Sequence, residues 1–183
     1  VFMTNNVIAD NNGGSGNGAA VYAQSGSSVH LVNNTIFNNN LYGDLGSGVY
    51  LAGGAHVLKN NIIAANGRYG VYRTSGTVTS LYNDVWGHLI SNYYNVAVGE
   101  GDFSRNPNLV GGGDYHPRSR AGSWHGGAWT VDDDHSPCID AGDPADGAGG
   151  EPPENGGRIN VGAYGGTPLA SKSIGYIPDA APR

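Results

Sequence analysis

The chain has 183 residues, a mass of 18.8 kDa, a formal net charge of −6 at pH 7 and a sequence pI near 5.3. Its nine Lys and Arg residues are scattered singly, so no basic stripe exists to neutralise a phosphate backbone, and nucleic acid is not expected as a partner. No apolar run approaches the roughly 20 residues that cross a bilayer, and a single cysteine, Cys138, excludes an intrachain disulfide framework.

A repeat organises the N-terminal half of the chain. Val21-Tyr22 recurs as Val49-Tyr50, and Asn33-Asn34 recurs at almost the same spacing as Asn60-Asn61. That spacing also places Asn5-Asn6 in an earlier, incomplete copy. A shorter spacing leads to a fourth copy, in which Val71-Tyr72 follows Val49-Tyr50 and Asn83 aligns with Asn60. Periods of about 20 to 50 residues indicate a repeat architecture such as a solenoid. Because residue 1 falls in the middle of a copy, we expect the chain to belong to a longer solenoid.

Each copy contains three short runs typical of β-strands, separated by Gly, Ser and Asn. In the second copy they are residues 21–23, 29–32 and 35–37. Three strands per copy predict an all-β fold, a right-handed parallel β-helix. A leucine-rich repeat would need a Leu ladder that is absent, and a propeller blade would need about 40 residues.

The paired Asn residues predict the corners of successive coils. Asn tolerates the left-handed backbone region that a sharp bend requires. Since neighbouring coils lie about 4.8 Å apart, Asn side chains at one corner can stack in a hydrogen-bonded ladder. Asn33 also opens the sequon Asn33-Asn34-Thr35, which makes it a candidate glycosylation site.

Three tyrosines, Tyr22, Tyr50 and Tyr72, recur at one place in the coil, next to insertions at residues 11–18 and 40–48. Val and Tyr alternate along a strand, so one of them faces outward, and the β-branched Val suits the core better. We therefore expect an outward tyrosine ladder on which the rings of a carbohydrate could stack; an inward, core-forming ladder is the alternative.

After Trp86 the period weakens. The runs FSRNPNLVGGGDYHPRSRAGS (residues 103–123), SPCIDAGDP (residues 136–144) and NGGRINVGAYGGTP (residues 155–168) resemble the C-terminal region of secreted right-handed parallel β-helix repeat proteins, a pectate-lyase-like class of solenoids. The resemblance implies an extracellular or cell-surface location in a prokaryote. We expect regular coils over residues 1–90, an irregular C-terminal coil and cap over 91–170, and a linker-like tail over 171–183.

Acidic residues gather in the C-terminal part among Gly and Pro. The candidates for a Ca²⁺ site are Asp132, Asp134, Asp143, Asp146 and Glu151, because a hard cation prefers oxygen ligands on flexible loops. Their spacing matches no EF-hand loop. The alternative is that Asp140 and Asp143 cap turns through their own backbone. We expect Arg158 to pair with one of these acids.

The repeat region offers no stacked carboxylates, because Asp10, Asp44 and Asp84 occupy non-equivalent positions. A lyase or hydrolase site is therefore not indicated, although the resemblance keeps one open. Two classes of function remain: a structural or adhesive surface solenoid that stacks end to end with copies of itself, or a module that binds or degrades polysaccharide.

Overall fold

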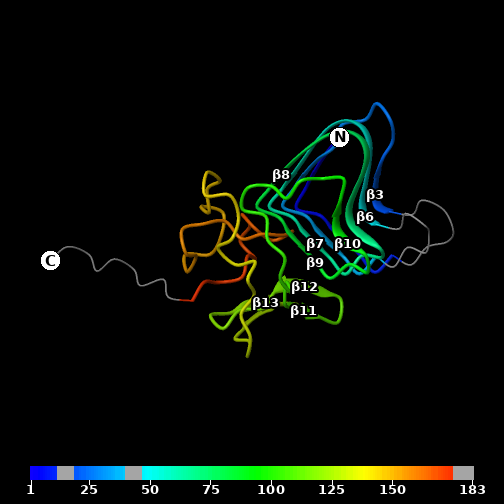
Figure 1. Cartoon of the computed structure of the whole chain (residues 1–183). Coiled ribbons are helices and arrows are strands. Elements are labelled where there is room, and N and C mark those ends of the chain that lie inside the picture. The colour runs from blue at the N-terminus through cyan, green and yellow to red at the C-terminus, as the bar shows by residue number, and fades with distance from the viewer. Residues whose placement is uncertain (12–18, 40–46, 175–183) are drawn as a thin grey trace.

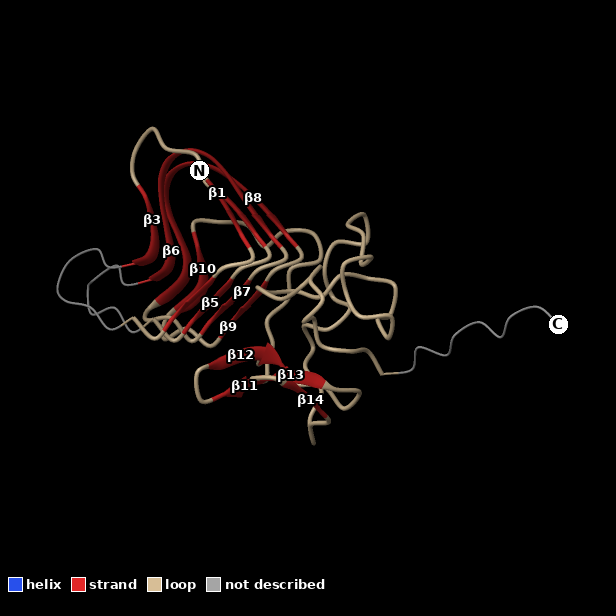
Figure 2. Ribbon diagram, turned by 180° about the vertical axis from the view of Figure 1, so that it is seen from behind, coloured by secondary structure: helices blue, strands red, loops and turns tan. Residues whose placement is uncertain are grey.

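The computed structural model describes residues 1–11, 19–39 and 47–174, and this part of the chain is a right-handed parallel β-helix with no α-helix (Figures 1 and 2). One sheet contains β1 (Phe2–Thr4), β3 (Ala19–Ala23), β4 (His30–Val32), β6 (Ser47–Lys59), β8 (Tyr69–Leu81) and β10 (Ser91–Tyr94). The second contains β2 (Val7–Ala9), β5 (Thr35–Phe37), β7 (Ile62–Ala64) and β9 (Asp84–Trp86). Figure 2 shows these strands stacked as successive coils.

The strand register reproduces the predicted repeat, with one correction. Val21 pairs with Val49 and Val49 pairs with Val71, as the spacing predicts. In the last coil, however, Asp84 pairs with Ile62, so the predicted alignment of Asn83 with Asn60 is wrong by one position. Tyr82 therefore occupies the corner position of Asn60, and both have a φ of 55°.

Aliphatic side chains from every coil fill the interior. Val21, Val49 and Val71 are buried, so the expectation that Val faces the core is confirmed. They join Leu31, Ile36, Leu58, Ile63 and Val85 in one continuous cluster. Such burial is the main stabilising contribution to a solenoid, because each coil covers the apolar face of the next.

A ladder of Asn side chains runs along the first corner, as predicted. The side-chain nitrogen of each Asn donates to Oδ1 of its counterpart in the next coil: Asn6 to Asn34 at 3.0 Å, Asn34 to Asn61 at 3.0 Å and Asn61 to Asn83 at 2.8 Å. The backbone N–H of each donor contacts the same oxygen. The preceding residues Asn5, Asn33 and Asn60 adopt the left-handed conformation with φ of 51–55°.

A second ladder lies at the next corner, and the sequence analysis missed it. The Nδ2 atoms of Asn11 and Asn39 donate at 2.8 Å to Oδ1 of Asn39 and Asn66, respectively. The residues before these Asn, namely Asp10, Asn38 and Ala65, again have positive φ. The spacing from Asn11 to Asn39 and from Asn39 to Asn66 equals that of the first ladder, and this was the available signal.

The segment from residue 136 to residue 173, called the flank segment below, lies beside the coils and not across their end (Figure 1). It contacts the first corner in every coil. Asn5 donates to the carbonyl of Ala163 at 2.8 Å, and Asn33 donates to the carbonyl of Asn160 at 3.1 Å. The outer face of the second sheet packs against this segment in a second apolar cluster that includes Ile62, Ala64, Cys138 and Val161.

Gly162 shows how closely the flank segment approaches the coils. Its φ is 102°, and a Cβ there would lie 2.6 Å from Cδ1 of Ile62. A side chain at this position would therefore meet both backbone strain and a clash.

Two antiparallel hairpins precede the flank segment: β11 (Leu109–Gly111) with β12 (Asp114–Pro117), and β13 (Ser123–His125) with β14 (Ala128–Thr130). The expected division at residue 90 is not a sharp one, because β10 and the bridges Leu81–Glu100 and Asp84–Phe103 continue the parallel pairing.

The expected tail from residue 171 begins too early. Ser171 and Ser173 are buried, and the backbone N–H of Ser173 donates to the carbonyl of Glu154 at 2.8 Å, so this part is packed. Residues 175–183 lie outside the described chain.

The prediction that Arg158 pairs with an acid is wrong, as judged from the described residues. Its guanidinium donates to the carbonyls of Gly142 and Ala141, the second at 3.1 Å, and lies 5.3 Å from the centre of the Tyr82 ring. Arg158 still attaches the flank segment to the last coil, as expected, but through carbonyls and an aromatic ring.

Candidate functional site

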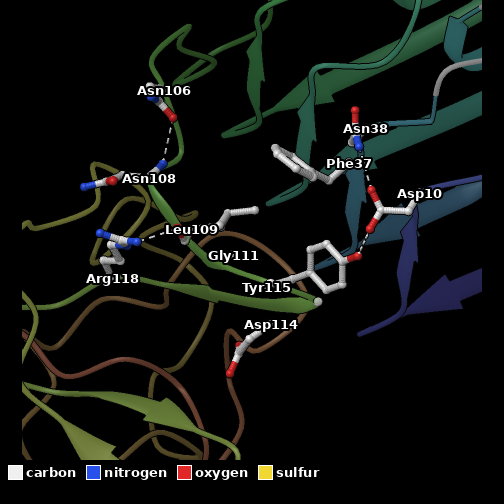
Figure 3. A pocket seen from close by; sticks show the side chains of 12 residues that line it. Asp10, Phe37, Asn38, Asn106, Asn108, Leu109, Gly111, Asp114, Tyr115 and Arg118 are labelled. Atoms are coloured by element: carbon white, nitrogen blue, oxygen red, sulfur yellow. Dashed lines mark hydrogen bonds between the residues drawn. The ribbon is translucent and has the colours of Figure 1, made fainter.

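A groove of about 460 Å³ lies between the second corner of the coils and the β11–β12 hairpin (Figure 3). Its volume is within the range of small-ligand sites. The side chains and turn residues that line it are Asp10, Phe37, Asn38, Asn106, Asn108, Leu109, Gly111, Gly112, Gly113, Asp114, Tyr115 and Arg118. Carboxylate, amide, guanidinium and phenol groups therefore face one space together with an aromatic wall.

Asp10 is the carboxylate on the coil side of the groove. It follows β2 at the corner, where its φ is 56°. Asn38 of the next coil donates to its Oδ1 at 2.6 Å, and the Tyr115 hydroxyl from the hairpin donates to its Oδ2 (Figure 3). The hydrogen bonds from Tyr115 and then from Asn38 lower the pKa of Asp10. Asp10 is therefore a stable anion and a hydrogen-bond acceptor.

The hairpin side of the groove is held by backbone contacts. Arg118 Nε donates to the carbonyl of Leu109 at 3.2 Å, and its NH2 group donates to that of Val110 at 3.0 Å. The hairpin turns at residues 111–113, three glycines whose φ values of 65–91° are favourable only for glycine. The guanidinium thus has a structural role, and the turn brings Tyr115 toward Asp10.

Asp114 lies between this groove and a second hollow of about 480 Å³ on the other face of the hairpin. There Nδ1 of His116 lies 2.6 Å from Asp114 Oδ1, and the His116 ring stacks on Tyr164. Burial lowers the pKa of His116, and the Asp114 contact opposes that shift. Trp124 completes an aromatic wall in this hollow.

The three predicted tyrosines form a ladder that points away from the core. Tyr22 stacks on Tyr50 with ring centroids 4.8 Å apart, and Tyr50 stacks on Tyr72 at 5.4 Å. Tyr94 of β10 extends the ladder, 4.4 Å from Tyr72. Ring faces inside the ladder are occupied by other rings: Tyr50 is only 6% exposed, whereas Tyr22 is 50% exposed. Stacking of a sugar on Tyr22, Tyr50 and Tyr72 stays a prediction, and in this geometry an end of the ladder offers more ring surface than its middle.

The five residues predicted to bind Ca²⁺ lie in separate environments. Asp146 Oδ1 lies 2.8 Å from Lys59 Nζ, and Asp143 Oδ2 lies 3.8 Å from the same nitrogen. Asp132 accepts hydrogen bonds from Ser119 and Ser123 in the β13–β14 hairpin region, and Asp134 is exposed. Within the described ranges, no group of three or more His, Cys, Asp or Glu side chains is arranged to hold a metal ion. Ca²⁺ binding by these residues stays a prediction.

Glu151 is the fifth of these residues, and it is buried in the flank segment. Its Oε1 accepts the backbone N–H groups of Asn160 at 2.8 Å and Gly166 at 2.9 Å. Burial raises its pKa. These bonds give Glu151 a structural role within the flank segment.

Asn33, the predicted glycosylation site, is 4% exposed. Its Nδ2, the atom that a glycan would modify, donates to the carbonyls of Asn160 and Gly162 at 3.1 and 3.4 Å. Glycosylation stays a prediction, and it would have to precede the packing of the flank segment onto the coils.

The sequence analysis did not single out a cluster of Ser123, His125 and Asp132. Ser123 Oγ lies 2.8 Å from His125 Nε2 and donates to Asp132 Oδ2 at 2.6 Å, while Asp132 Oδ1 lies 3.1 Å from the same His125 nitrogen. A nucleophilic triad needs the serine and the carboxylate on opposite ring nitrogens. Here both contact Nε2 and Ser123 is buried, so the cluster closes the hairpin.

Asp84 is a buried carboxylic acid between the coils and the flank segment. Its Oδ1 accepts the backbone N–H of Arg105 at 3.0 Å, and its Oδ2 lies 3.3 Å from Sγ of the buried Cys138. Burial is the main cause that raises the pKa of Asp84 to about 7. The sequence analysis gave Asp84 no role, because only the fold brings it against Cys138.

Comparison with known proteins identifies the fold and leaves the activity open. The stacked coils, the Asn ladders and the flank segment define a parallel β-helix module. The family model described as right handed beta helix region matches residues 1–106, which is more than half of the chain, and the chain belongs to this family. A second model, described as disaggregatase related, matches residues 77–142. No curated protein and no solved structure matches the chain.

The disaggregatase-related match includes every groove residue given above for the hairpin side, from Asn106 to Arg118. The described residues contain no helix that is long and apolar enough to cross a membrane.

Proposed function

We propose that this chain is an adhesive β-helix module of a prokaryotic surface or extracellular protein, and that it binds polysaccharide in the groove between Asp10 and the β11–β12 hairpin. The observation that supports the proposal is the convergence of Asp10, Asn38 and Tyr115 on one open space beside Phe37 (Figure 3). Carbohydrate recognition needs planar polar groups for the sugar hydroxyls and an aromatic surface for the C–H face of the ring.

The charge of the groove favours a neutral polysaccharide. Among the described lining residues, Asp10 and Asp114 are the carboxylates and Arg118 is the cation, and Arg118 already donates to two carbonyls. A polyuronate would bring further negative charge to a chain that carries −6. Neutral glycans with free hydroxyls are therefore the preferred class of ligand.

Binding without cleavage is the simpler chemistry for these residues. A hydrolase needs one carboxyl group that holds a proton near neutral pH. Asp10 has the opposite property, because its hydrogen bonds from Tyr115 and Asn38 lower its pKa. The proposal therefore assigns Asp10 the role of a hydrogen-bond acceptor for a sugar hydroxyl.

Affinity gel electrophoresis followed by calorimetry on the retained polysaccharide tests the proposal. A panel of neutral and uronic-acid polymers separates the two ligand classes. Asp10→Asn preserves the shape and tolerates the positive φ, and it should weaken binding about 10-fold or more through loss of a charged acceptor. Tyr115→Ala removes the aromatic wall and should weaken binding by a similar factor.

The matched control is Asp134→Asn, which makes the same charge change at an exposed position outside the groove. It should bind as the unchanged chain does. Equal loss in both Asp variants would indicate a general charge effect. Loss with Tyr22→Ala and none with Asp10→Asn would place the glycan on the tyrosine ladder and reject the groove.

A further inference from the structure

The hollow of about 480 Å³ on the other face of the β11–β12 hairpin is built from three separate parts of the chain. The β12 strand contributes Asp114 and His116, and the β13–β14 hairpin contributes Trp124. The flank segment contributes Tyr164 and Leu169. A hollow of this size, lined by aromatic rings and a few polar side chains, is typical of a small-ligand site.

The groove and the hollow lie on opposite faces of one strand. Successive side chains of a β-strand alternate between its two faces. Tyr115 points into the groove, and the Asp114 carboxylate points away from it, toward the side of His116 (Figure 3). Residues 112–114 line both spaces, so the groove and the hollow meet at the turn of the hairpin.

The turn between the two spaces carries no side chain. Gly111, Gly112 and Gly113 are all exposed, and a Cβ added at any of them would meet no atom within 4 Å. Their positive φ values require glycine, and the same residues leave the backbone of the turn open to close approach by a ligand. A chain-like ligand can therefore pass from the groove to the hollow in contact with this backbone.

The polar groups of the hollow have unused hydrogen-bonding capacity. The backbone N–H and Nδ1 of His116 both contact Oδ1 of Asp114, and no described donor reaches Oδ2. His116 is 5% exposed, and its Nε2 has no hydrogen-bond partner among the described residues, although buried polar atoms are normally paired. Because Nδ1 contacts the carboxylate, Nε2 of the neutral ring is an acceptor. A ligand hydroxyl would supply the donor that both atoms lack.

Two aromatic rings stand beside these acceptors. Tyr164 is fixed by stacking on His116, with ring centroids 3.4 Å apart. Trp124 meets Trp129 edge to face, at 74° and 5.4 Å, and no described ring stacks on it in parallel. Trp124 is also only half-buried, so it offers ring surface of the kind that contacts the C–H face of a sugar.

We propose that the hollow is a second sugar subsite, and that one neutral glycan chain occupies both the groove and the hollow by passing over the glycine turn. The inference rests on the proposed function of the groove, and it adds that the ligand is a polymer longer than a disaccharide. The described lining of the hollow contains Asp114 and no Lys or Arg, so it suits the same neutral class. Since the two subsites meet at residues 112–114, a chain bound in one holds its next units at the other.

Calorimetry with a length series of cello-, manno- and malto-oligosaccharides, from disaccharide to octasaccharide, tests the inference on the full chain. A disaccharide fills the groove alone, and the octasaccharide should bind at least about tenfold more tightly because it reaches both subsites. Trp124→Ala should remove this gain and leave disaccharide binding unchanged, which also shows that the variant is folded. The matched control is Trp129→Ala, because Trp129 lines a different hollow. It should keep the gain.

Gly112→Asn tests the passage over the turn. Asn tolerates the φ of 65° at this position, and its side chain would occupy the open space that the ligand must cross. The variant should lose most of the gain with length and keep disaccharide binding. Gly26→Asn is the matched control, since Gly26 also has a positive φ and open space around it and lies outside both subsites.

The outcomes separate the second subsite from the groove. Equal affinity at every length would overturn the second subsite and leave the groove proposal intact. A gain with length that survives both Trp124→Ala and Gly112→Asn would also overturn it, because the added sugar units would lie elsewhere. Absence of binding at every length would reject the groove, and the second subsite with it. Octasaccharide binding that Trp124→Ala abolishes and Asp10→Asn leaves unchanged would reject the shared chain.

Discussion

The coils and the flank segment are held by different kinds of contact. In the coils the same bonds recur, so a buried ladder Asn satisfies groups in the coils on both sides, as Asn61 does for Leu31 in the preceding coil and Asn83 in the following one. In the flank segment each contact occurs once, such as Arg158 on Tyr82 or Glu151 on Asn160. Loss of one rung should therefore disturb two coils, whereas loss of one flank contact should loosen a local region. The predictions below test this difference.

The largest effect is expected from Asn61→Ala in the middle of the first ladder. The change leaves the buried backbone N–H of Asn34 without its acceptor and removes the side-chain bonds of Asn61 to the carbonyl of Leu31 and to Asn83. At about 1 to 3 kcal/mol for the unsatisfied N–H and about 1 kcal/mol for each other lost bond, the free energy of unfolding should fall by about 3 to 5 kcal/mol. Urea denaturation measures it. The matched control Asn6→Ala, at the exposed end of the ladder, should cost about 1 kcal/mol. Equal costs would contradict the ladder as the stabilising element.

The next effect is a pH dependence from Asp84. Burial raises its pKa in the folded chain from the ordinary 3.8 to about 7, so between these values the folded state holds a proton that the unfolded state has lost. Stability therefore falls as pH rises from about 4 to about 7 and then levels off. Asp84→Asn should remove that slope and raise the free energy of unfolding at pH 8 by about 2 to 4 kcal/mol.

Urea denaturation of both chains at several pH values checks this prediction. Cys138→Ala provides the control, since it removes the Sγ contact and keeps the acid. A parallel pH profile in the Asp84→Asn chain and the unchanged chain would show that Asp84 is ionised in the fold.

A smaller effect is expected from Arg158→Lys. Lysine keeps the charge and loses the planar fork that serves the carbonyls of Ala141 and Gly142 and covers Tyr82. We expect a loss of about 1 to 2 kcal/mol in the free energy of unfolding, with faster hydrogen exchange confined to the flank segment. Arg120→Lys is the matched control, because Arg120 makes an exposed contact to the carbonyl of Asp133. Faster exchange throughout the coils would contradict a local role.

The sequence predicted the coils because the interactions that form them recur at a fixed spacing along the chain. Val49 and Asn61 occupy positions that a fixed spacing marks in each copy, so a period suffices to find the core and the first ladder. The groove could not be found in this way. Asp10 and Tyr115 are far apart in the sequence and meet only because the three-glycine turn brings the hairpin to the corner. Arg158 was assigned to an ion pair because composition shows nearby acids and does not show which carbonyls lie closer.

The smallest effect is expected from removal of divalent cations. The predicted Ca²⁺ ligands engage separate partners: Lys59 holds Asp143 and Asp146, hydroxyl groups and N–H groups hold Asp132, and backbone N–H groups hold Glu151. A cation would have to displace these contacts before it gathered enough oxygen ligands. The melting temperature should therefore change by less than about 1 °C between chelator and excess Ca²⁺, since a bound ion would add stability in proportion to its saturation. The contrary result would be a rise of several degrees in melting temperature with Ca²⁺. If Asp146→Asn abolished that rise and Asp132→Asn did not, Ca²⁺ would lie beside Lys59, where the coils contact the flank segment.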